Sequence, residues 1–209
     1  MERISLIIGS KSPRRQDLIK ELRFPVEIRT EDVEEIYPDT LDPRMVPEYL
    51  SKLKAEPLVE SLRDNDILVT SDTIVLLDND VIGKPKSEEE ARNMLGRLSN
   101  RTHEVITGVC LTSNKKEFVF SSITKVTFSE LSSEDIEHYV RAYSPMDKAG
   151  SYAIQEWIGF IGISKIEGCY YNVMGLPLHD LRRAIISEFV KWFASNLSSF
   201  SFVIYLERR

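Results

Sequence analysis

Short apolar runs alternate with amphipathic segments along the chain, and their order predicts an α/β architecture. Residues 4–8 form an apolar run of strand length, which a polar loop connects to a helix. Ser12 is a suitable N-cap for that helix and Pro13 suits its first position, so we expect it to continue to about Leu22. Residues 26–30 then read as a second strand.

The middle of the chain continues the same mixture. A helical spacing of apolar residues over 42–63 contains Pro57, which should kink or divide that helix. Residues 67–77 are rich in β-formers, and the turn residues 78–80 predict a hairpin that returns through 81–82. The next helix starts at Ser87, which forms a predicted capping box with Glu90; its apolar face and its end are marked by Ala91, Met94, Leu95, Leu98 and Asn100.

The second half predicts a long antiparallel pair, followed by helices. Residues 104–111 and 117–128 alternate in polarity on either side of a turn at 113–116. A short helix is expected over 133–142, and two more strands after the loop 143–155. An amphipathic helix near the end is marked by Leu178, Leu181, Ile185 and Phe189.

Length and composition suit one compact α/β domain, or two small lobes that share a cleft. The chain has 209 residues, of which 42% are apolar, so it has material for a substantial core. We assign residues 1–190 to a single domain and 191–209 to a C-terminal tail. The tail is Ser-rich and then apolar, and the sequence leaves open whether it is an added strand, a dimer contact or a poorly ordered terminus.

Charge and cysteine content narrow the class of protein. A net charge of -6 argues against a nucleic-acid-binding surface, which needs Lys and Arg to neutralise phosphates. The cysteines Cys110 and Cys169 have no CxxC spacing, as is typical of a reducing compartment. No secretory segment follows Met1, and no uncharged apolar stretch is long enough to span a bilayer. We therefore expect a cytoplasmic protein without membrane or nucleic-acid partners.

The loop 9–15 is the first candidate for chemistry. It places hydroxyl groups, a lysine, Arg14 and Arg15 at the start of a helix, where free N–H groups and the helix dipole favour an anion such as phosphate. The alternative is that Ser12 and Pro13 only cap the helix and that the cationic side chains are solvated.

Asp72 follows an apolar run that predicts a buried strand, and carboxylates are rarely buried without a partner. In a cleft with phosphates it can bind a divalent ion or take a proton from water. The alternative is a turn or capping aspartate, the interpretation we prefer for Asp78 and Asp80. Glu34, Glu35, Lys54 and Lys84 read singly as surface charges, although the turn Gly83-Lys84-Pro85 constrains the lysine.

Residues 147–155 combine charge, glycine, an aromatic ring and an amide, which suits recognition of a base or sugar edge. His103 is favoured as a structural hydrogen-bonding residue, because the chain has three histidines and no HxxxH or HxH pair. The sequence therefore gives little support to a zinc site.

Taken in order, these segments resemble the Maf family of nucleotide pyrophosphatases, over essentially residues 4–189. Four blocks carry the resemblance. They are Ser10-Lys11-Ser12-Pro13-Arg14-Arg15, then Ser71-Asp72-Thr73-Ile74-Val75, then Gly83-Lys84-Pro85 continuing to Leu98-Ser99 and through residues 103–108, and finally residues 147–155 with Tyr171-Asn172-Val173-Met174-Gly175-Leu176-Pro177.

The resemblance implies a fold, an activity and a set of site residues. The fold is a mixed, strongly curved β-sheet flanked by helices, with two lobes around a central nucleotide-binding cleft, similar to inosine triphosphatases. The activity is cleavage of a nucleoside triphosphate between its α and β phosphates, with Mg²⁺ or Mn²⁺ as the divalent cofactor, in a homodimer. The implied residues are Asp72 as proton acceptor, Glu35 with Asp72 at the metal, Lys54 and Lys84 in the cleft, and Ser10, Arg14 and Arg15 in the phosphate-contacting loop.

The resemblance also implies a substrate. Arg14, Thr73 and Gln155 match the combination of the dTTP/UTP branch, and a glutamine amide offers the donor and acceptor that complement the O4/N3 edge of thymine or uracil. Among the departures, Glu156 stands where a glycine is common, which bears on the mobility of the specificity loop. A non-catalytic nucleotide-binding regulator of septum formation or cell division stays as the alternative, since such a protein needs the phosphate loop but not Asp72.

Overall fold

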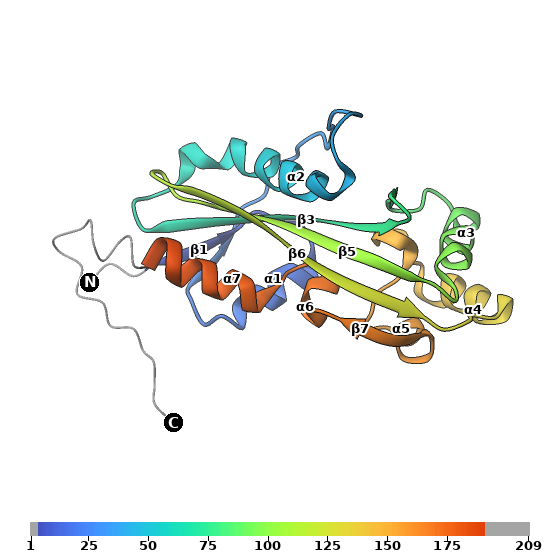
Figure 1. Cartoon of the computed structure of the whole chain (residues 1–209). Coiled ribbons are helices and arrows are strands. Elements are labelled where there is room, and N and C mark those ends of the chain that lie inside the picture. Colours follow the sequence, from blue (N-terminus) through green and yellow to red (C-terminus); the bar gives the residue numbers. More distant parts are fainter. Residues whose placement is uncertain (1–3, 191–209) are drawn as a thin grey trace, which may run out of the picture.

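A computed structural model describes residues 4–190, and the tail 191–209 lies outside the described residues. The centre of this part of the chain is one mixed sheet of seven strands in the order β2-β1-β3-β5-β6-β7, with β4 paired to β3 (Figure 1). The strands are β1 (Ser5–Ile8), β2 (Val26–Ile28), β3 (Asp66–Leu77), β4 (Asp80–Ile82), β5 (Thr102–Thr112), β6 (Glu117–Phe128) and β7 (Ile163–Glu167).

Parallel and antiparallel pairing meet on strand β3. Strand β1 runs parallel to both β2 and β3, whereas β3, β5, β6 and β7 are antiparallel neighbours. On one edge, β3 pairs with β1 over residues 66–69 and with the hairpin strand β4 over residues 75–77. Residues 70–74 lie between these two partners, so this edge is open in the middle of the strand.

The helices are α1 (Pro13–Lys20), α2 (Val46–Ala55), α3 (Glu88–Leu98), α4 (Ser133–Tyr143), α5 (Trp157–Gly162), α6 (Tyr170–Val173) and α7 (Leu178–Ala184), with shorter turns η1 (Pro43–Met45), η2 (Glu56–Ser61), η3 (Ala149–Ser151) and η4 (Ile185–Val190). Helices α3, α4 and α5 lie at one end of the long strands, whereas α2 lies along one side of the sheet and α1, α6 and α7 along the other (Figure 1). One large apolar core is built on β1 with the helices beside it, and another on the distal ends of β3, β5 and β6, while α2 packs on two smaller clusters between them. These two large cores are the two lobes of the predicted α/β fold, which is thereby confirmed.

Most predicted elements occur where the sequence placed them. Helix α2 ends before Pro57, which lies in the 3₁₀ turn η2, so the division at proline is confirmed. The predicted amphipathic helix is α7 continued by the π-helical turn η4, with Leu181, Ile185 and Phe189 fully buried. None of the helices within residues 4–190 is long and apolar enough to cross a membrane.

Two local predictions were wrong. After residue 155 the described chain contains one strand, β7, rather than two, because the apolar run Trp157–Gly162 forms helix α5. Short apolar runs do not distinguish a strand from a buried helix. The capping box at Ser87 is also incomplete: its hydroxyl accepts from the Glu90 N–H at 3.1 Å, but the Glu90 carboxylate accepts from the N–H of Lys86.

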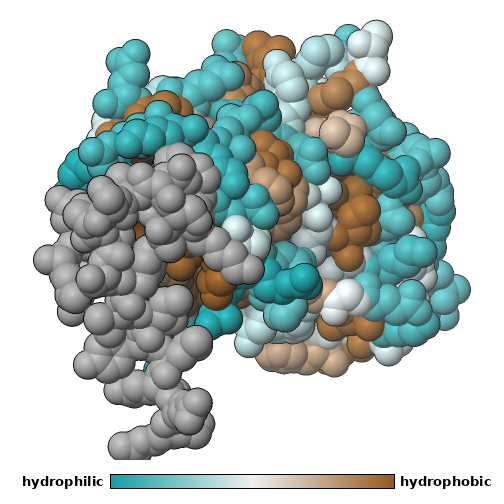
Figure 2. Space-filling model, turned by 60° about the vertical axis from the view of Figure 1, so that its left-hand side comes forward, coloured by the Kyte–Doolittle hydropathy of each residue, from teal (hydrophilic) through white to brown (hydrophobic). Residues whose placement is uncertain are grey.

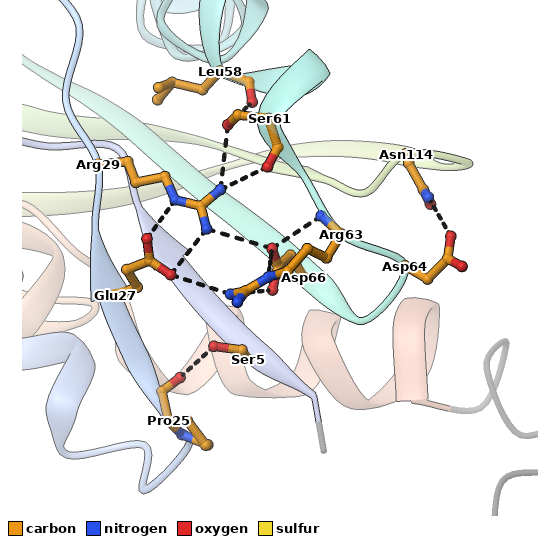
Figure 3. A network of polar contacts seen from close by, with 10 residues as sticks. All are labelled: Ser5, Pro25, Glu27, Arg29, Leu58, Ser61, Arg63, Asp64, Asp66 and Asn114. Atoms are coloured by element: carbon orange, nitrogen blue, oxygen red, sulfur yellow. Dashed lines mark hydrogen bonds and ion pairs between the residues drawn. The ribbon is translucent and has the colours of Figure 1, made fainter. Parts of the chain in front are cut away.

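A polar network fixes the start of β3 against β2 and the preceding turn (Figure 3). Asp66 is 1% exposed, and the Arg63 guanidinium donates to both of its carboxylate oxygens, while Arg29 lies 3.7 Å away. Glu27 accepts from Arg29 and Arg63 at the rim. Buried charge of this kind is tolerated because it is paired, and the network holds the edge of the sheet in register.

The surface carries both hydrophilic residues and exposed apolar side chains. Figure 2 shows one face on which hydrophobic residues form separate patches among hydrophilic ones. Isolated apolar side chains on a surface are normal for a folded protein.

Helix α2 packs directly on strand β5 at Gly108. A Cβ atom built at this glycine would lie 2.2 Å from the Pro47 carbonyl carbon and 2.3 Å from the Glu48 nitrogen, both backbone atoms of α2. Backbone atoms cannot move aside as a flexible side chain does, so only glycine allows the helix this close to the sheet. The contact sets the height of α2, which carries Lys54.

Gly108→Ala should therefore lift α2 from the sheet and lower the free energy of unfolding by about 1–3 kcal/mol. Gly96→Ala is the matched control, because a Cβ at this position of α3 meets no atom within 4 Å. Since glycine weakens a helix interior, the control should gain about 0.5–1 kcal/mol. Urea denaturation of both variants measures the difference, and equal stabilities would contradict the close packing at Gly108.

Candidate active site

The candidate site is a cleft of about 380 Å³ beside the open edge of β3. At this edge β1 has ended and the chain turns through the loop 9–12 into α1, so the first turn of that helix faces the cleft. Ligands of open α/β sheets bind at the carboxyl ends of strands where the strand order changes. The loop 9–15, singled out from the sequence, and Asp72 on β3 therefore lie at one cleft.

Strand alternation brings side chains to the cleft from both faces of β3. Thr70 and Asp72 point toward α2, since the Thr70 hydroxyl donates to the Ser51 carbonyl and Asp72 contacts Lys54. Thr73 points to the opposite face, where its hydroxyl lies 2.8 Å from Arg15. The open edge lets both neighbours serve one site.

The cleft has the opposite charge to the protein as a whole. Six cationic side chains and two carboxylates line it, although the chain has a net charge of -6. A local excess of positive charge in a cleft favours an anionic guest and strengthens its field there. The lining charges are Lys11, Arg14, Arg15, Lys54, Lys84 and Lys148 against Asp72 and Asp147.

Lys54 lies between two carboxylates at the floor of the cleft. Its Nζ is 2.6 Å from Asp72 Oδ1 and 2.9 Å from Glu35 Oε1, and Asp72 is 8% exposed. Burial raises the pKa of Glu35, but the hydrogen bond and charge of Lys54, helped by Lys84 and Arg15, outweigh it and hold that pKa below its ordinary value. Glu35 is thus ionised throughout the neutral range.

Replacing this lysine should change the titration of its partner. Lys54→Met removes the group that chiefly lowers the pKa of Glu35. Burial then acts with less opposition, so the pKa of Glu35 should rise. A carboxyl whose folded pKa is depressed stabilises the fold above its unfolded pKa and loses that contribution as pH falls. The free energy of unfolding of the variant should therefore fall less than that of wild type as the pH is lowered through the ordinary glutamate pKa of 4.5.

Carbon-13 NMR of glutamate carboxyl groups, recorded against pH, measures this shift. Lys52→Met is the control, because Lys52 lies on the same helix but pairs with Glu117 at 2.7 Å, away from the cleft. An unchanged Glu35 titration in Lys54→Met would refute the pairing.

Arg15 forms the wall of the cleft rather than projecting freely into it. Its Nε donates to the Gly175 carbonyl at 2.8 Å, Nη1 to the Ser71 carbonyl at 2.7 Å and Nη2 to the Thr73 hydroxyl at 2.8 Å. Burial lowers the pKa of Arg15, and Asp72 opposes this shift. Gly175 has φ +105°, and a Cβ there would lie 3.2 Å from Arg15 Nε, so glycine permits this approach.

The rest of the phosphate loop divides into shaping and charged residues. The Ser10 hydroxyl accepts from the Ser12 N–H at 3.2 Å, and Gln16 donates to the Ser10 carbonyl, so Ser10 braces the loop. Arg14 lines the cleft and contacts Asp147 at 3.3 Å. Lys84 lines it from the turn after β4. Both Ser10 and Arg15 make hydrogen bonds within the protein. Their contact with phosphate stays a prediction.

Gln155 also lines the cleft, and its side chain has an acceptor without a partner. Its Oε1 atom is buried and has no hydrogen-bond partner among the described residues. Buried polar atoms in native proteins nearly always have a partner, so an exception at a cleft points to a ligand donor. The third predicted specificity residue, Thr73, supports the wall through Arg15 and through Thr107 Oγ1 at 2.9 Å.

A polar residue of the block 171–177 supports this wall, a role that no sequence pattern predicted. Asn172 is fully buried, and its side-chain amide donates to the Val105 carbonyl and to the Thr124 hydroxyl, while its backbone carbonyl accepts from the Thr107 hydroxyl. The only signal was an asparagine in an otherwise apolar and aromatic segment. Its backbone and side chain connect α6 to the sheet directly behind Thr73.

His103 has the structural role expected of it. Its Nε2 lies 2.7 Å from the hydroxyl of Tyr152, the aromatic residue of the loop 147–155, which lines the cleft. Burial lowers the pKa of His103 to about 4, so the ring is neutral at physiological pH. Within residues 4–190 no group of three or more His, Cys, Asp or Glu is arranged to hold a metal ion by itself.

Fold and cleft together define an α/β protein whose cationic cleft suits a polyanion and carries the Gln155 amide in its lining. The sequence matches the Maf-like protein family over residues 5–188, and the chain belongs to this family.

Relatives agree with this assignment, and a solved structure shares the fold. The chain is 50% identical over 182 residues to a dTTP/UTP pyrophosphatase of Phocaeicola vulgatus, covering 87% of this chain and 94% of the relative. It is 51% identical over 176 residues to a dTTP/UTP pyrophosphatase of Flavobacterium psychrophilum, covering 84% and 90%. A HAM1 protein from Coxiella burnetii shares the fold, with a TM-score of 0.51 at 13% identity over 88% of this chain and 98% of that one.

Proposed function

We propose that this protein hydrolyses UTP and dTTP to the nucleoside monophosphate and pyrophosphate. The observation that carries the proposal is the meeting of Arg14, Lys54 and Asp72 in one cleft, which Gln155 also lines with an oxygen that has no partner among the described residues. The names of two relatives at about half identity support the same activity. Removal of pyrimidine triphosphates from the nucleotide pool is the corresponding cellular role.

The cationic side chains can neutralise the negative charge of the substrate. A nucleoside triphosphate carries about four negative charges, and phosphoryl transfer depends mainly on positioning and on stabilising that charge. Arg14, Lys54 and Lys84 line one cleft and can contact phosphate oxygens without long-range movement of the chain. The neighbouring Arg15 adds its charge from the wall.

Asp72 is the residue that we assign to the attacking water. Its carboxylate is held by Lys54 and reaches the cleft from β3, which gives it a fixed direction. The water oxygen forms a bond to the α-phosphorus, its proton passes to Asp72, and the bond between the α-phosphorus and the bridging oxygen breaks to release pyrophosphate.

The carboxylates also suit a divalent ion. Glu35 and Asp72 converge on one point at Lys54, and Mg²⁺ is commonly held by one or two carboxylates together with substrate phosphates. These two residues would hold Mg²⁺ or Mn²⁺, and the bound ion would supply further charge neutralisation to the phosphates. That donor set needs the substrate to complete it.

Gln155 provides the base contact. Uracil and thymine present a donor at N3 and an acceptor at O4, which match the Oε1 acceptor and Nε2 donor of one amide. Cytosine presents the reverse pair. A site built to bond one pattern leaves a buried polar group unpaired with the other, which is a strong basis for selection.

Asp72→Asn should reduce pyrophosphate release from UTP and dTTP by about 10²- to 10⁴-fold, because an amide cannot take the proton of the water. Circular dichroism and urea unfolding should show an intact fold. Asp78→Asn is the control, since Asp78 lies at the exposed turn after β3 and pairs with Arg101. Near-normal turnover by Asp72→Asn would refute its assigned role.

The same assay separates the enzyme from the alternative regulator. Wild-type protein with dTTP and Mg²⁺ should release pyrophosphate stoichiometrically with dTMP. Nucleotide binding without any release would favour a non-catalytic nucleotide-binding protein.

The cytoplasmic location and the homodimer remain part of this proposal. Both described cysteines are free, which agrees with a reducing compartment. The homodimer rests on resemblance, and light scattering of the purified protein measures it.

A further inference from the structure

A single buried hydroxyl contacts both ends of the turn that carries Gln155. The Tyr139 side chain of α4 is fully buried, and its OH accepts from the Ala153 N–H at 3.2 Å and donates to the Glu156 carboxylate. The Glu156 N–H closes the same turn on the Ala153 carbonyl at 3.1 Å. Gln155 therefore lies in a four-residue turn that is bonded both across itself and to the α4 helix behind it.

Helix α5 holds the turn from the opposite side. The N–H groups of Gly159 and Phe160 donate to the Glu156 carbonyl. A Cβ at Gly159 would lie 2.0 Å from the Ile154 carbonyl oxygen, so the helix packs directly on the turn backbone. The backbone that carries Gln155 is thus fixed before any ligand arrives, which restricts where its side-chain amide can lie in the cleft.

The carboxylate of Glu156 also faces the phosphate end of the cleft. Its Oε1 lies 3.5 Å from Lys148 Nζ, and this lysine, which is 8% exposed, donates to Asp147 Oδ1 at 2.8 Å. Asp147 in turn contacts Arg14. Polar contacts therefore run from the base-recognition turn to a phosphate-loop arginine.

We propose that Tyr139 and Glu156 are positioning residues that aim the Gln155 amide and so determine the preference for uracil and thymine over cytosine. The inference rests on the proposed function, because it concerns base selection in the same cleft. Neither side chain needs to touch the substrate. Their effect is to hold the amide where its donor and acceptor meet the base edge together, which lowers the cost of ordering on binding.

The hydroxyl is suited to this task at every working pH. Burial, reinforced by the hydrogen bond and charge of Glu156, raises the pKa of Tyr139, so the group stays protonated and continues to donate. The charged and titratable groups facing Glu156 are Tyr139 and Lys148.

The test measures the affinities of UMP and CMP by calorimetry in wild type, Tyr139→Phe, Glu156→Ala and Glu156→Gln. Loss of one aiming hydrogen bond should reduce the UMP:CMP affinity ratio by about three- to tenfold in Tyr139→Phe and in Glu156→Ala. Glu156→Gln retains an acceptor for the tyrosine hydroxyl and should recover most of the ratio. Tyr139→Phe combined with Glu156→Ala should lose less than the sum of the two single changes, because both remove the contact between Tyr139 and Glu156.

Tyr143→Phe is the matched control. Tyr143 stacks on Tyr139 with ring centroids 5.0 Å apart and is 40% exposed, so its variant tests the loss of a neighbouring hydroxyl from the same helix. Its UMP:CMP ratio should equal that of wild type.

Two results would overturn the inference. An unchanged ratio in Tyr139→Phe and Glu156→Ala would show that the contact does not aim the amide, and an equal loss of both affinities would show a structural role only. If Tyr139→Phe does not fold, the two Glu156 variants decide alone. Binding is measured apart from catalysis, so failure of wild type to release pyrophosphate would count against the proposed function without deciding this question.

Discussion

The site depends on the contact of one ammonium group with two carboxylates. Lys54 pairs Asp72 and Glu35, which allows both acids to stay charged in a partly buried cleft where either alone would be costly. The three residues come from α2, β3 and the segment before α2, so their meeting requires the tertiary fold. Gly108 sets the height of α2, and a core contact thereby determines the position of a functional charge.

The open edge of β3 explains why the cleft lies here. A continuous partner strand would have covered residues 70–74, but β1 ends before them and β4 begins after them. The Ser71 carbonyl accepts a hydrogen bond from Arg15, whose guanidinium also donates to the Thr73 hydroxyl and the Gly175 carbonyl. The guanidinium thus replaces a missing strand partner and shapes the wall at the same time.

Local patterns predicted the parts of this site, and the tertiary contacts decided their roles. Strand and helix periodicity placed Asp72 on a strand and the loop 9–15 before a helix, because these are properties of neighbouring residues. Lys54 and Asp72 are 18 residues apart in the sequence, and no periodic pattern predicts that their side chains meet. The supporting role of Asn172 was not predicted for the same reason, since its partners lie on β5 and β6.

The proposed phosphate and base contacts depend on different physics. Around Lys54, charges of both signs compensate one another, and in the proposed reaction such fields stabilise the developing charge. At Gln155 the proposed contact is a neutral amide, whose value lies in direction rather than strength, so rigid support matters more there. Glu156 connects the two regions, because it accepts from Tyr139 beside Gln155 and faces Lys148, which contacts Asp147 and through it Arg14. A carboxylate at this position gives the turn a charged anchor that a glycine could not provide.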